Sequence, residues 1–343
     1  MDTTTNDSIA AKLNAKVESF ATREEWLAAR RTYGIGSSDV PAILGISRFQ
    51  SALALYHEKK GLKAPSPATE EQRRWGQILE EPIAQRFALE TKRPVYNPND
   101  GDFKILRRTD RPFMIASVDR IQICDAHNAM SQGFVLAEGM TPAPAEGMGI
   151  LEIKNAHLMM RDEWQGEHAN NQPPVEYQVQ LQHQLAVTGA LWGSIAALIG
   201  GVIFLWADVP RDQELIDRLI DMEAEFMRRL ELSDPPLADG SESSRDVLRK
   251  LYPKDNGQLI TLGPEALEWH HALEAAKLAR KQAEADEALM SNLLKQAIGE
   301  NTGGILPDGN IYTHKWQERA EFLSPKSEFR VLRLKQAGKK NGK

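Results

Sequence analysis

Two acidic residues and one lysine lie in strongly apolar stretches of this sequence. Glu152 and Lys154 belong to the run Ile-Leu-Glu-Ile-Lys-Asn at 150–155, and Asp119 lies in an apolar run that begins at Phe113. Alternate side chains of a β-strand point to the same face, so we expect Glu152 and Lys154 to share one face. With the carboxylate of Asp119 on a neighbouring strand, they could hold a divalent cation and a water molecule. Oxygen ligands of this kind suit Mg²⁺ or Mn²⁺, which points to phosphodiester hydrolysis.

An ordinary surface ion pair would also account for Glu152 and Lys154. Their neighbours Ile150, Leu151 and Ile153 are all strongly apolar, however, so the strand is expected to lie in the protein interior. Buried charges are rarely found unless they are paired or bind a metal. The sequence therefore favours a functional cluster over a solvated ion pair.

A third carboxylate comes from the segment Trp-Gly-Gln-Ile-Leu-Glu-Glu-Pro, which begins at Trp75. On a helix, Glu80 shares a face with Ile83 and Phe87. Glu81 is turned away from that face by about 100°. We therefore select Glu80 as the inward-facing acid. The alternative is that both glutamates only favour the start of a helix, where negative charge is stabilising.

Residues 34–39 form a short loop, Gly-Ile-Gly-Ser-Ser-Asp, with the character of a phosphate-binding turn. Its two glycines let the backbone approach a ligand closely. Ser37 and Ser38 offer hydrogen-bond donors at the start of the next helix, and Arg31 can add a bidentate contact to a phosphate. Capping of the helix that begins at Val40 would also explain the serines, and both roles can hold at once.

Tyr177 and Gln180 lie in a segment, 175–188, whose spacing of apolar residues favours a helix over a strand. The two side chains are three positions apart and therefore share one helix face. Such a pair can orient a water molecule or contact a phosphate, and a polar helix flank is the alternative. The histidines are scattered and do not form a zinc site of their own.

Length and composition describe an ordinary globular protein, with 343 residues and 41% hydrophobic residues. A single cysteine excludes an intramolecular disulfide, a Cys-based zinc site and a four-thiolate iron–sulfur cluster. The polar N-terminus lacks a signal-peptide pattern, and the longest apolar run, 195–207, is too short to span a bilayer. We therefore expect a cytoplasmic protein with no membrane segment.

The net charge of −6 does not by itself favour nucleic-acid binding. The distribution of charge is more informative than its total. Basic residues gather in the N-terminal half, whereas acidic residues concentrate in 212–246 and 265–287. A basic N-terminal half that contacts phosphates and an evenly mixed surface both fit this pattern.

Helices and strands must position these candidate residues. Apolar periodicity and capping residues predict helices at 8–31, 52–60, about 75–90, 157–169, 175–188, 211–231 and 264–298. Strands are expected within 94–123, around Glu152, and at 194–199 and 202–206 on either side of a Gly-Gly turn. The stretch 125–149 is expected to be a loop between two strands, and 303–316 a small hairpin.

Five motifs stand in one order along the chain: Gly-Ile-Gly-Ser-Ser-Asp, Trp-Gly-Gln-Ile-Leu-Glu-Glu-Pro, Ala-Ser-Val-Asp, Leu-Glu-Ile-Lys and Tyr-Gln-Val-Gln-Leu-Gln-His-Gln-Leu-Ala-Val-Thr-Gly. This ordered set resembles the YqaJ-like viral recombinase family, the phage alkaline exonucleases of the PD-(D/E)xK nuclease superfamily. The resemblance extends over residues 25–210.

The resemblance implies an α/β (α+β) fold, in which helices flank a mixed central β-sheet. It implies a restriction-endonuclease-like nuclease core at 1–232 and a helical C-terminal region at 233–343. The implied activity is that of a Mg²⁺- or Mn²⁺-dependent 5′→3′ exonuclease on double-stranded DNA ends. Its products are 5′-phosphorylated nucleotides and 3′ single strands. The implied partners are a single-strand annealing protein and further copies of the chain in a homo-oligomer, with a ring trimer as the family precedent. The implied setting is a phage or prophage in a bacterial host.

The resemblance also assigns metal ligands by position. Asp119 and Glu152 would bind the metal together with the carbonyl of Ile153, and Glu80 would assist from its helix. The sequence departs from the family at Ser-Val-Asp, where Pro-Asp or Glu-Asp is common. The preceding residue is not a ligand, so Asp119 keeps its role.

Further roles follow from the same resemblance. Lys154 would position or deprotonate the attacking water, with Gln180 beside it as a supporting glutamine. Arg31 and Ser38 match the spacing of a 5′-phosphate pocket. Arg161 is the nearest candidate for a further arginine that follows the Glu-x-Lys motif, although it lies one residue out of register.

Two other functions fit the same residues. One is a sequence- or structure-specific endonuclease on the same fold. The other is a non-catalytic DNA-binding or assembly protein, for which the long helix at 264–298 could mediate self-association. The presence of Asp119, Glu152 and Lys154 together argues against the second, because binding alone does not need all three.

Overall fold

The computed structural model describes residues 15–32, 34–62, 70–99, 103–124, 147–165 and 172–318. The chain divides into two compact units, 1–251 and 252–343. The sequence placed this boundary after residue 232. The first unit also includes α10 (Glu242–Leu251), because Val247 of this helix is buried against Leu53 and Ala54. Most of the loop expected at 125–149 lies outside the described residues.

The first unit is built on a five-stranded sheet with strand order β2-β5-β6-β7-β8. β6 and β7 run parallel, and the other neighbours pair antiparallel. The strands are β2 (Val95–Tyr96), β5 (Arg120–Cys124), β6 (Gly147–Ala156), β7 (Trp192–Ile199) and β8 (Ile203–Pro210). This arrangement confirms the predicted α/β class, a mixed central sheet flanked by helices.

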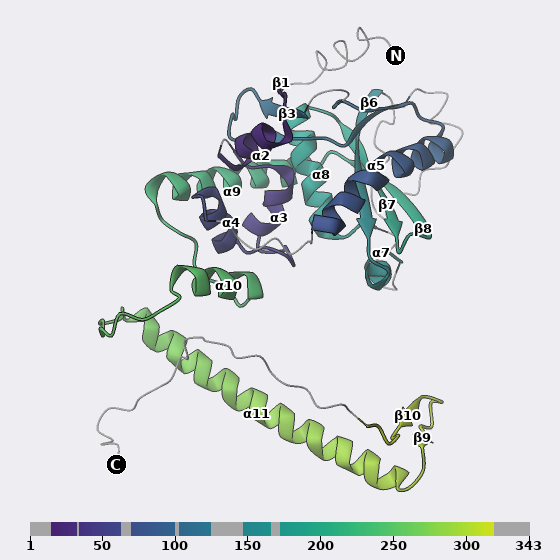
Figure 1. Ribbon diagram of the computed structural model, residues 1–343, viewed down its shortest axis with the longest axis vertical. Helices are drawn as coiled ribbons and strands as arrows, with labels where there is room; N and C mark the ends of the chain where they lie inside the picture. The colour runs from purple at the N-terminus through teal and green to yellow at the C-terminus, as the bar shows by residue number, and fades with distance from the viewer. Residues whose placement is uncertain are drawn as a thin grey trace. The chain divides into compact units, whose positions relative to one another are not determined.

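One face of the sheet is covered by α5 (Glu70–Thr91), which begins earlier than its expected start near residue 75 (Figure 1). Phe87 of this helix is fully buried in a cluster that includes Leu151 and Ile153 of β6. Because side chains alternate along a strand, Glu152 and Lys154 must point to the other face. The predicted division of β6 into an apolar and a charged face is therefore confirmed.

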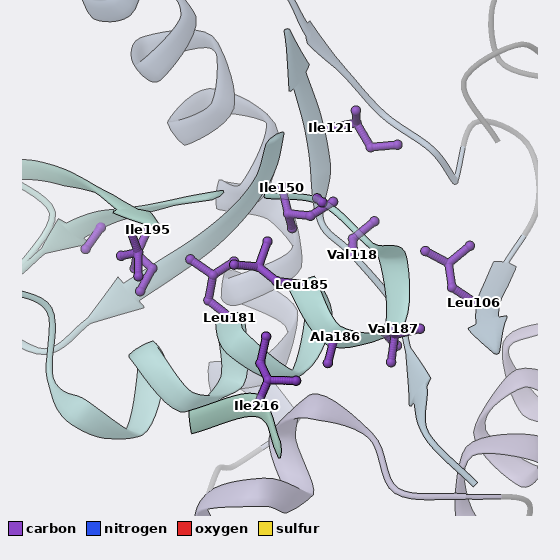
Figure 2. Packing of buried hydrophobic residues seen from close by; sticks show 14 of the residues in the cluster. Leu106, Val118, Ile121, Ile150, Leu181, Leu185, Ala186, Val187, Ile195 and Ile216 are labelled. Atoms are coloured by element: carbon purple, nitrogen blue, oxygen red, sulfur yellow. The ribbon is translucent and has the colours of Figure 1, made fainter. Parts of the chain in front are cut away.

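The other face of the sheet is covered by α8 (Val175–Thr188), which confirms the helix expected there. Its Leu181 and Leu185 pack against Ile150 of β6 and Ile195 of β7 in the largest hydrophobic cluster of the described residues (Figure 2). All four side chains are completely buried. The charged face of β6 therefore meets α8, the helix that also carries Tyr177 and Gln180.

A second sheet, with strand order β1-β3-β4, lies beside the first and corrects one prediction. The single helix expected at 8–31 is wrong for the part that the structure describes, from residue 15 on, because Ala15–Phe20 forms β1 and helix α2 extends over Arg23–Thr32. Thr22 and Glu25 exchange side-chain-to-backbone hydrogen bonds at 3.2 and 3.3 Å, a capping box that starts the helix here. The sheet is completed by β3 (Phe103–Arg108) and β4 (Ile115–Ala116).

A helix cap and the expected Gly-Gly turn shape the rest of this unit. Ser51 caps α4 (Ala52–Lys59) by accepting a hydrogen bond from the Ala54 N–H at 3.1 Å. The β7–β8 hairpin turns at Gly200 and Gly201, whose φ angles of 58° and 74° favour glycine. The remaining helices of this unit include α3 (Val40–Ile43), the short α7 (Arg161–Gln165) within the stretch expected to be helical at 157–169, and α9 (Gln213–Leu232).

The second unit contains the predicted long helix and small hairpin. α11 extends over Glu265–Ile298, and the hairpin pairs β9 (Gly303–Ile305) with β10 (Ile311–Thr313). None of the described helices combines the length and the apolar character needed to cross a lipid bilayer.

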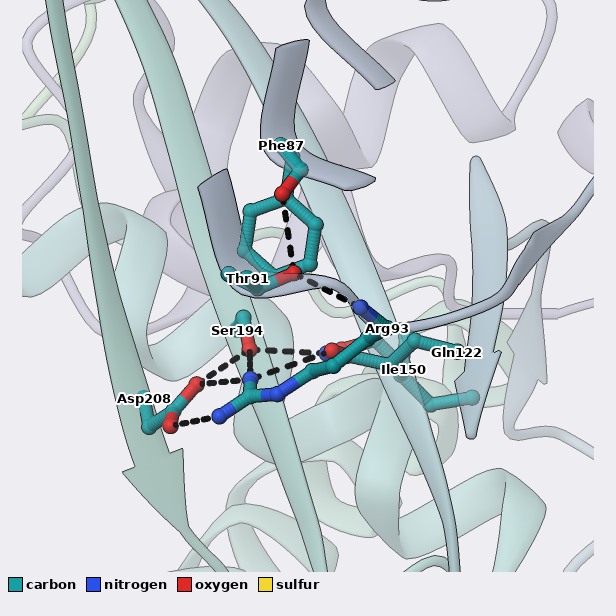
Figure 3. A network of polar contacts seen from close by, with 7 residues as sticks. All are labelled: Phe87, Thr91, Arg93, Gln122, Ile150, Ser194 and Asp208. Carbon is teal, nitrogen blue, oxygen red and sulfur yellow. Dashed lines mark hydrogen bonds and ion pairs between the residues drawn. The ribbon is translucent and has the colours of Figure 1, made fainter. Parts of the chain in front are cut away.

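A buried ion pair ties β8 to the chain that follows α5 (Figure 3). The guanidinium of Arg93 makes two hydrogen bonds of 2.8 Å to the carboxylate of Asp208, and both side chains are almost completely buried. Gln122 of β5 and Ser194 of β7 extend this network across the sheet. Trp192 lies 5.1 Å from the guanidinium, a cation–π contact that favours its charge.

We predict that Asp208→Asn strongly destabilises the first unit. The substitution leaves the Arg93 guanidinium buried without a counter-charge, which costs about 3–5 kcal/mol in comparable pairs. Urea unfolding of the variant measures the loss. Glu214→Ala is the matched control, because its partner Arg218 is solvent-exposed and such pairs contribute little. A loss for Asp208→Asn no larger than that of the control would contradict the prediction.

Candidate active site

The loop at 34–39 is held against the smaller sheet by its backbone. The Ile35 N–H donates to the Phe113 carbonyl at 2.7 Å, and the Ile115 N–H donates to the Ile35 carbonyl at 2.9 Å. A Cβ atom at Gly34 would lie 2.4 Å from the Phe113 oxygen, so this close approach requires glycine. The pairing fixes Ser37 and Ser38 at the rim of a cleft beside β6.

Asp119 can reach β6 because the pairing of β5 with β6 ends at Arg120, one residue short of Asp119. The last pair in the register is Arg120 with Leu151. The sequence suggested that Asp119 lies within the strand, but it lies in a bend that precedes β5. Its Oδ2 accepts a hydrogen bond from the Ile153 N–H at 2.8 Å. The carboxylate thus takes the place of the missing strand partner and lies beside the Glu-Ile-Lys segment.

Lys154 and Glu152 make direct contact on the α8 side of β6. The Lys154 ammonium donates to Glu152 Oε1 at 2.5 Å and to Gln180 Oε1 at 2.9 Å. The second carboxylate oxygen of Glu152, Oε2, accepts from Gln184 Nε2 at 2.7 Å. The predicted trio of Glu152, Lys154 and Gln180 is therefore brought together, and Gln184 joins it.

Glu80 is the glutamate of α5 that faces the cleft, whereas Glu81 is more exposed. Arg120 lies between them, 3.8 Å from Glu80 and 2.9 Å from Glu81. Glu81 also accepts a hydrogen bond from Gln85 one helical turn further along. The helical-phase argument thus selected the glutamate that lines the same cleft as Asp119.

The carboxylates of the cleft repel one another. Burial raises the pKa of Asp119 well above its ordinary value, and the charges of Glu152 and Glu80 raise it further. Burial also raises the pKa of Glu80, although Arg120 acts in the opposite direction. For Lys154, burial lowers the pKa, but the charges of Glu152 and Asp119 outweigh this effect and raise it overall. The cleft therefore concentrates negative charge that a cation would relieve.

The donor set fits a hard divalent cation. The carboxylates of Asp119 and Glu152 are oxygen ligands, the type that Mg²⁺ and Mn²⁺ prefer. Within the described ranges, no three His, Cys, Asp or Glu side chains converge closely enough to hold one ion alone. Mg²⁺ commonly binds through one or two carboxylates and completes its shell with water and substrate phosphates. The two carboxylates match that requirement.

The cleft continues from the carboxylates to a basic and aromatic end. It has a volume of about 610 Å³ and is lined there by Trp26, Arg30, Ser38 and Ser117. The Arg30 guanidinium lies 4.7 Å above the Trp26 ring and donates to Ser38 Oγ at 3.2 Å. Trp26 Nε1 donates to Ser117 Oγ at 3.3 Å. Hydroxyl and guanidinium donors at this end suit a phosphate.

Three predicted phosphate or DNA contacts lie elsewhere. Arg31 is exposed and lines a neighbouring cavity that shares Ser38 and Gln180 with the cleft, whereas the phase of α2 directs Arg30 to the cleft itself. Arg161 is exposed at the start of α7 and does not line the cleft. Tyr177 lies behind Lys154, with its ring 4.8 Å from the ammonium, and lines the same neighbouring cavity as Arg31.

Sequence reasoning missed Arg30, Trp26 and Gln184. Trp26 and Arg30 are four positions apart, the spacing of neighbours on one helix face. Gln184 lies four positions after Gln180 and seven after Tyr177, so the spacing that linked those two residues also includes it. Helical spacing was therefore an available signal for each of them.

Comparison with known proteins supports the class of phage-type nucleases for this chain. Residues 25–191 of the chain match the YqaJ-like viral recombinase domain. The chain is 29% identical over 290 residues to the Bacillus subtilis (strain 168) protein called "Uncharacterized protein YqaJ". The alignment covers 83% of this chain and 81% of that protein. The recognition from motif order is thereby confirmed.

Solved structures resemble the chain more distantly. An alkaline exonuclease from Laribacter hongkongensis, LHK-Exo, is 18% identical with a TM-score of 0.43, and the match covers 67% of this chain and 98% of that one. LHK-Exo in complex with dAMP is 20% identical with a TM-score of 0.45 over the same shares.

We predict that Asp119→Asn raises the melting temperature in metal-free buffer at neutral pH. The raised pKa means that ionisation of Asp119 destabilises the folded state as pH rises through the folded pKa. Asparagine removes the charge and keeps an oxygen that can accept from the Ile153 N–H. Each 1 kcal/mol of relief raises the melting temperature by roughly 2–4 °C. The difference should shrink as the pH falls towards 4.

Scanning calorimetry in EDTA measures this effect. Asp110→Asn is the control, because the Arg108 guanidinium lowers the pKa of Asp110 and its charge is therefore not destabilising. Mg²⁺ should then stabilise the wild type but not Asp119→Asn. A lower melting temperature for Asp119→Asn than for the wild type in EDTA would refute the prediction.

Proposed function

We propose that this protein is a metal-dependent exonuclease that degrades one strand of double-stranded DNA from its ends in the 5′→3′ direction. The products would be 5′-phosphorylated nucleotides and a 3′ single strand. The match to the viral recombinase domain supports a DNA substrate and a recombination setting. The observation that carries the proposal is the meeting of Asp119, Glu152 and Lys154 where β5 and β6 part.

Each residue of this cluster has a task in phosphodiester hydrolysis. Mg²⁺ or Mn²⁺, held by Asp119, Glu152 and the Ile153 carbonyl, would acidify a water molecule and neutralise charge on the phosphate. Lys154 donates to Glu152 and Gln180, and an ammonium group has three donors. Its remaining N–H can hold the attacking water or a phosphate oxygen in line with the scissile bond.

The basic end of the cleft supports the proposed action on strand ends. Arg30 and Ser38 present donors to a terminal 5′-phosphate, and stacking on Trp26 holds the guanidinium of Arg30 in place. A phosphate anchored there would set the first phosphodiester at the metal ligands. Such positioning is a large part of catalysis in hydrolytic enzymes.

The remaining parts of the proposal follow from the family resemblance. The 3′ single strand would be used by a single-strand annealing protein, and the chain would act as a homo-oligomer, with a ring trimer as the precedent. The setting would be the cytoplasm of a bacterium that carries the phage or prophage.

We predict that Lys154→Ala keeps the fold and loses cleavage by roughly 10²–10⁴-fold, the range typical of a group that assists proton transfer or positions water. The side chain is partly exposed, so its removal leaves no large cavity. The assay is digestion of linear duplex DNA with Mg²⁺. Asn155→Ala is the control, because Asn155 is an exposed neighbour on the same strand. Digestion at the wild-type rate by Lys154→Ala would contradict the assignment.

Covalently closed circular DNA in the same assay separates the proposed function from its alternatives. An exonuclease digests the linear duplex and leaves the circle intact. Nicking of the circle would instead identify an endonuclease. Binding of both substrates without cleavage by the wild type would identify a non-catalytic DNA-binding protein.

We predict that Arg30→Ala removes the preference for 5′-phosphorylated over 5′-hydroxyl ends, whereas Arg31→Ala retains it. Hydrogen bonds between charged groups contribute about 1.5–3 kcal/mol, so the rate on phosphorylated ends should fall roughly 10- to 100-fold. Initial rates on duplexes with each kind of end measure the preference. A selective loss in Arg31→Ala rather than Arg30→Ala would place the phosphate at the neighbouring cavity.

A further inference from the structure

Two glutamines of α8, Gln182 and Gln184, are almost completely buried but bond to different partners. Gln182 is satisfied by backbone on both sides, since its Nε2 donates to the Pro210 carbonyl at 2.7 Å and its Oε1 accepts from the Asp212 N–H at 2.9 Å. Gln184 Nε2 donates to Glu152 at 2.7 Å and lies 3.5 Å from Ser37 Oγ. One glutamine therefore joins α8 to the start of α9, and the other joins α8 to the cleft.

The hydrogen bond from Gln184 restricts the Glu152 carboxylate. The terminal torsion of a glutamate side chain is broad, so a carboxylate held at one oxygen can still rotate. Here Lys154 binds Oε1 and Gln184 binds Oε2, and the two donors come from different elements. Together they fix the plane of the carboxylate. Lone pairs remain on both oxygens for a cation, because an ionised carboxylate has about four acceptor sites.

The other amide atom of Gln184 points to the same conclusion. Its Oε1 is buried and has no hydrogen-bond partner among the described residues, although Gln184 lines the cleft. An unsatisfied buried acceptor costs about 1–3 kcal/mol and requires an explanation such as an ordered water or ion. A water in the shell of a divalent cation is a donor of the required kind. Such a water would satisfy Oε1.

We propose that Gln184 is a positioning residue of the metal site, whose amide holds the Glu152 carboxylate in the orientation that binds a divalent cation. The proposal rests on the proposed function, which makes Glu152 a metal ligand. Gln184 acts through Glu152 and is not itself a ligand. Hydrogen-bond partners of metal ligands typically contribute 10- to 100-fold to metal affinity.

The test is calorimetric titration of MnCl₂ into the full chain without DNA, for the wild type, Gln184→Met and Gln182→Met. Methionine is unbranched and of similar length, and it makes no N–H hydrogen bond. We expect Mn²⁺ affinity to fall by roughly 10- to 100-fold in Gln184→Met. Gln182→Met removes an equally buried glutamine from the same helix, so it should lower the melting temperature and keep the wild-type Mn²⁺ affinity.

A second substitution covers the case in which Gln184→Met does not fold. Gln184→Asn keeps an amide, but its side chain is one methylene shorter and cannot reach Glu152 from the same backbone position. It should also weaken Mn²⁺ binding, with a circular dichroism spectrum like that of the wild type. Loss of binding in folded Gln184→Asn supports the proposal in the same way.

The outcomes separate this inference from the proposed function. Wild-type Mn²⁺ affinity in a folded Gln184 variant would overturn the role of Gln184 and leave the metal site standing. An equal loss in Gln182→Met would also overturn it, because the effect would then come from disturbance of α8. Failure of the wild type to bind Mn²⁺ would overturn the metal-dependent function itself, and this inference with it.

Discussion

The site depends on one constraint, the point at which β5 and β6 cease to pair. Beyond Arg120 and Leu151, the strands no longer exchange backbone hydrogen bonds, and the Ile153 N–H is left facing the cleft. A buried N–H must find an acceptor, and the carboxylate of Asp119 supplies it. The hydrogen bond needed for folding is therefore the same one that brings Asp119 beside Glu152. Two acidic groups are held together despite their repulsion because the backbone of β6 binds one of them.

The two helical layers complete the cluster from opposite sides. α5 contributes Glu80 from the face that buries Leu151, and α8 contributes Gln180 and Gln184 from the face that carries Glu152. Charged groups are tolerated in this position because each has a partner: a guanidinium, an ammonium, an amide or a backbone N–H. These partners do not cancel all of the negative charge of the carboxylates in the cleft. A divalent cation is the group that would cancel it.

The sequence predicted the parts of this site that depend on local periodicity. The alternation of side chains along β6 placed Glu152 and Leu151 on opposite faces of the strand. The helical repeat of α5 placed Glu80 on the inward face and Glu81 away from it. Both predictions were possible because the strand and the helix repeat at a fixed number of residues. Periodicity does not say where an element begins, so β1 was absorbed into a helix at 8–31. The Thr22–Glu25 capping box sets the start of α2, and the packing of α2 then directs Arg30 to the cleft. The contact of Arg30 with Ser38 in the cleft depends on tertiary structure. Spacing in the sequence does not reveal such a contact, and for this reason the sequence analysis selected Arg31.

The buried network around Arg93 relates to the site through strand register. Gln122, Ser194 and Asp208 belong to three strands and point to the α5 face, opposite to Glu152 and Lys154. A slip of one residue in any strand would turn its polar side chain to the other face and leave the guanidinium of Arg93 without that partner. Because an unpaired buried charge is costly, the network disfavours such slips. The register that it stabilises is the one in which pairing ends at Arg120, so the far face of the sheet helps to determine where Asp119 meets β6.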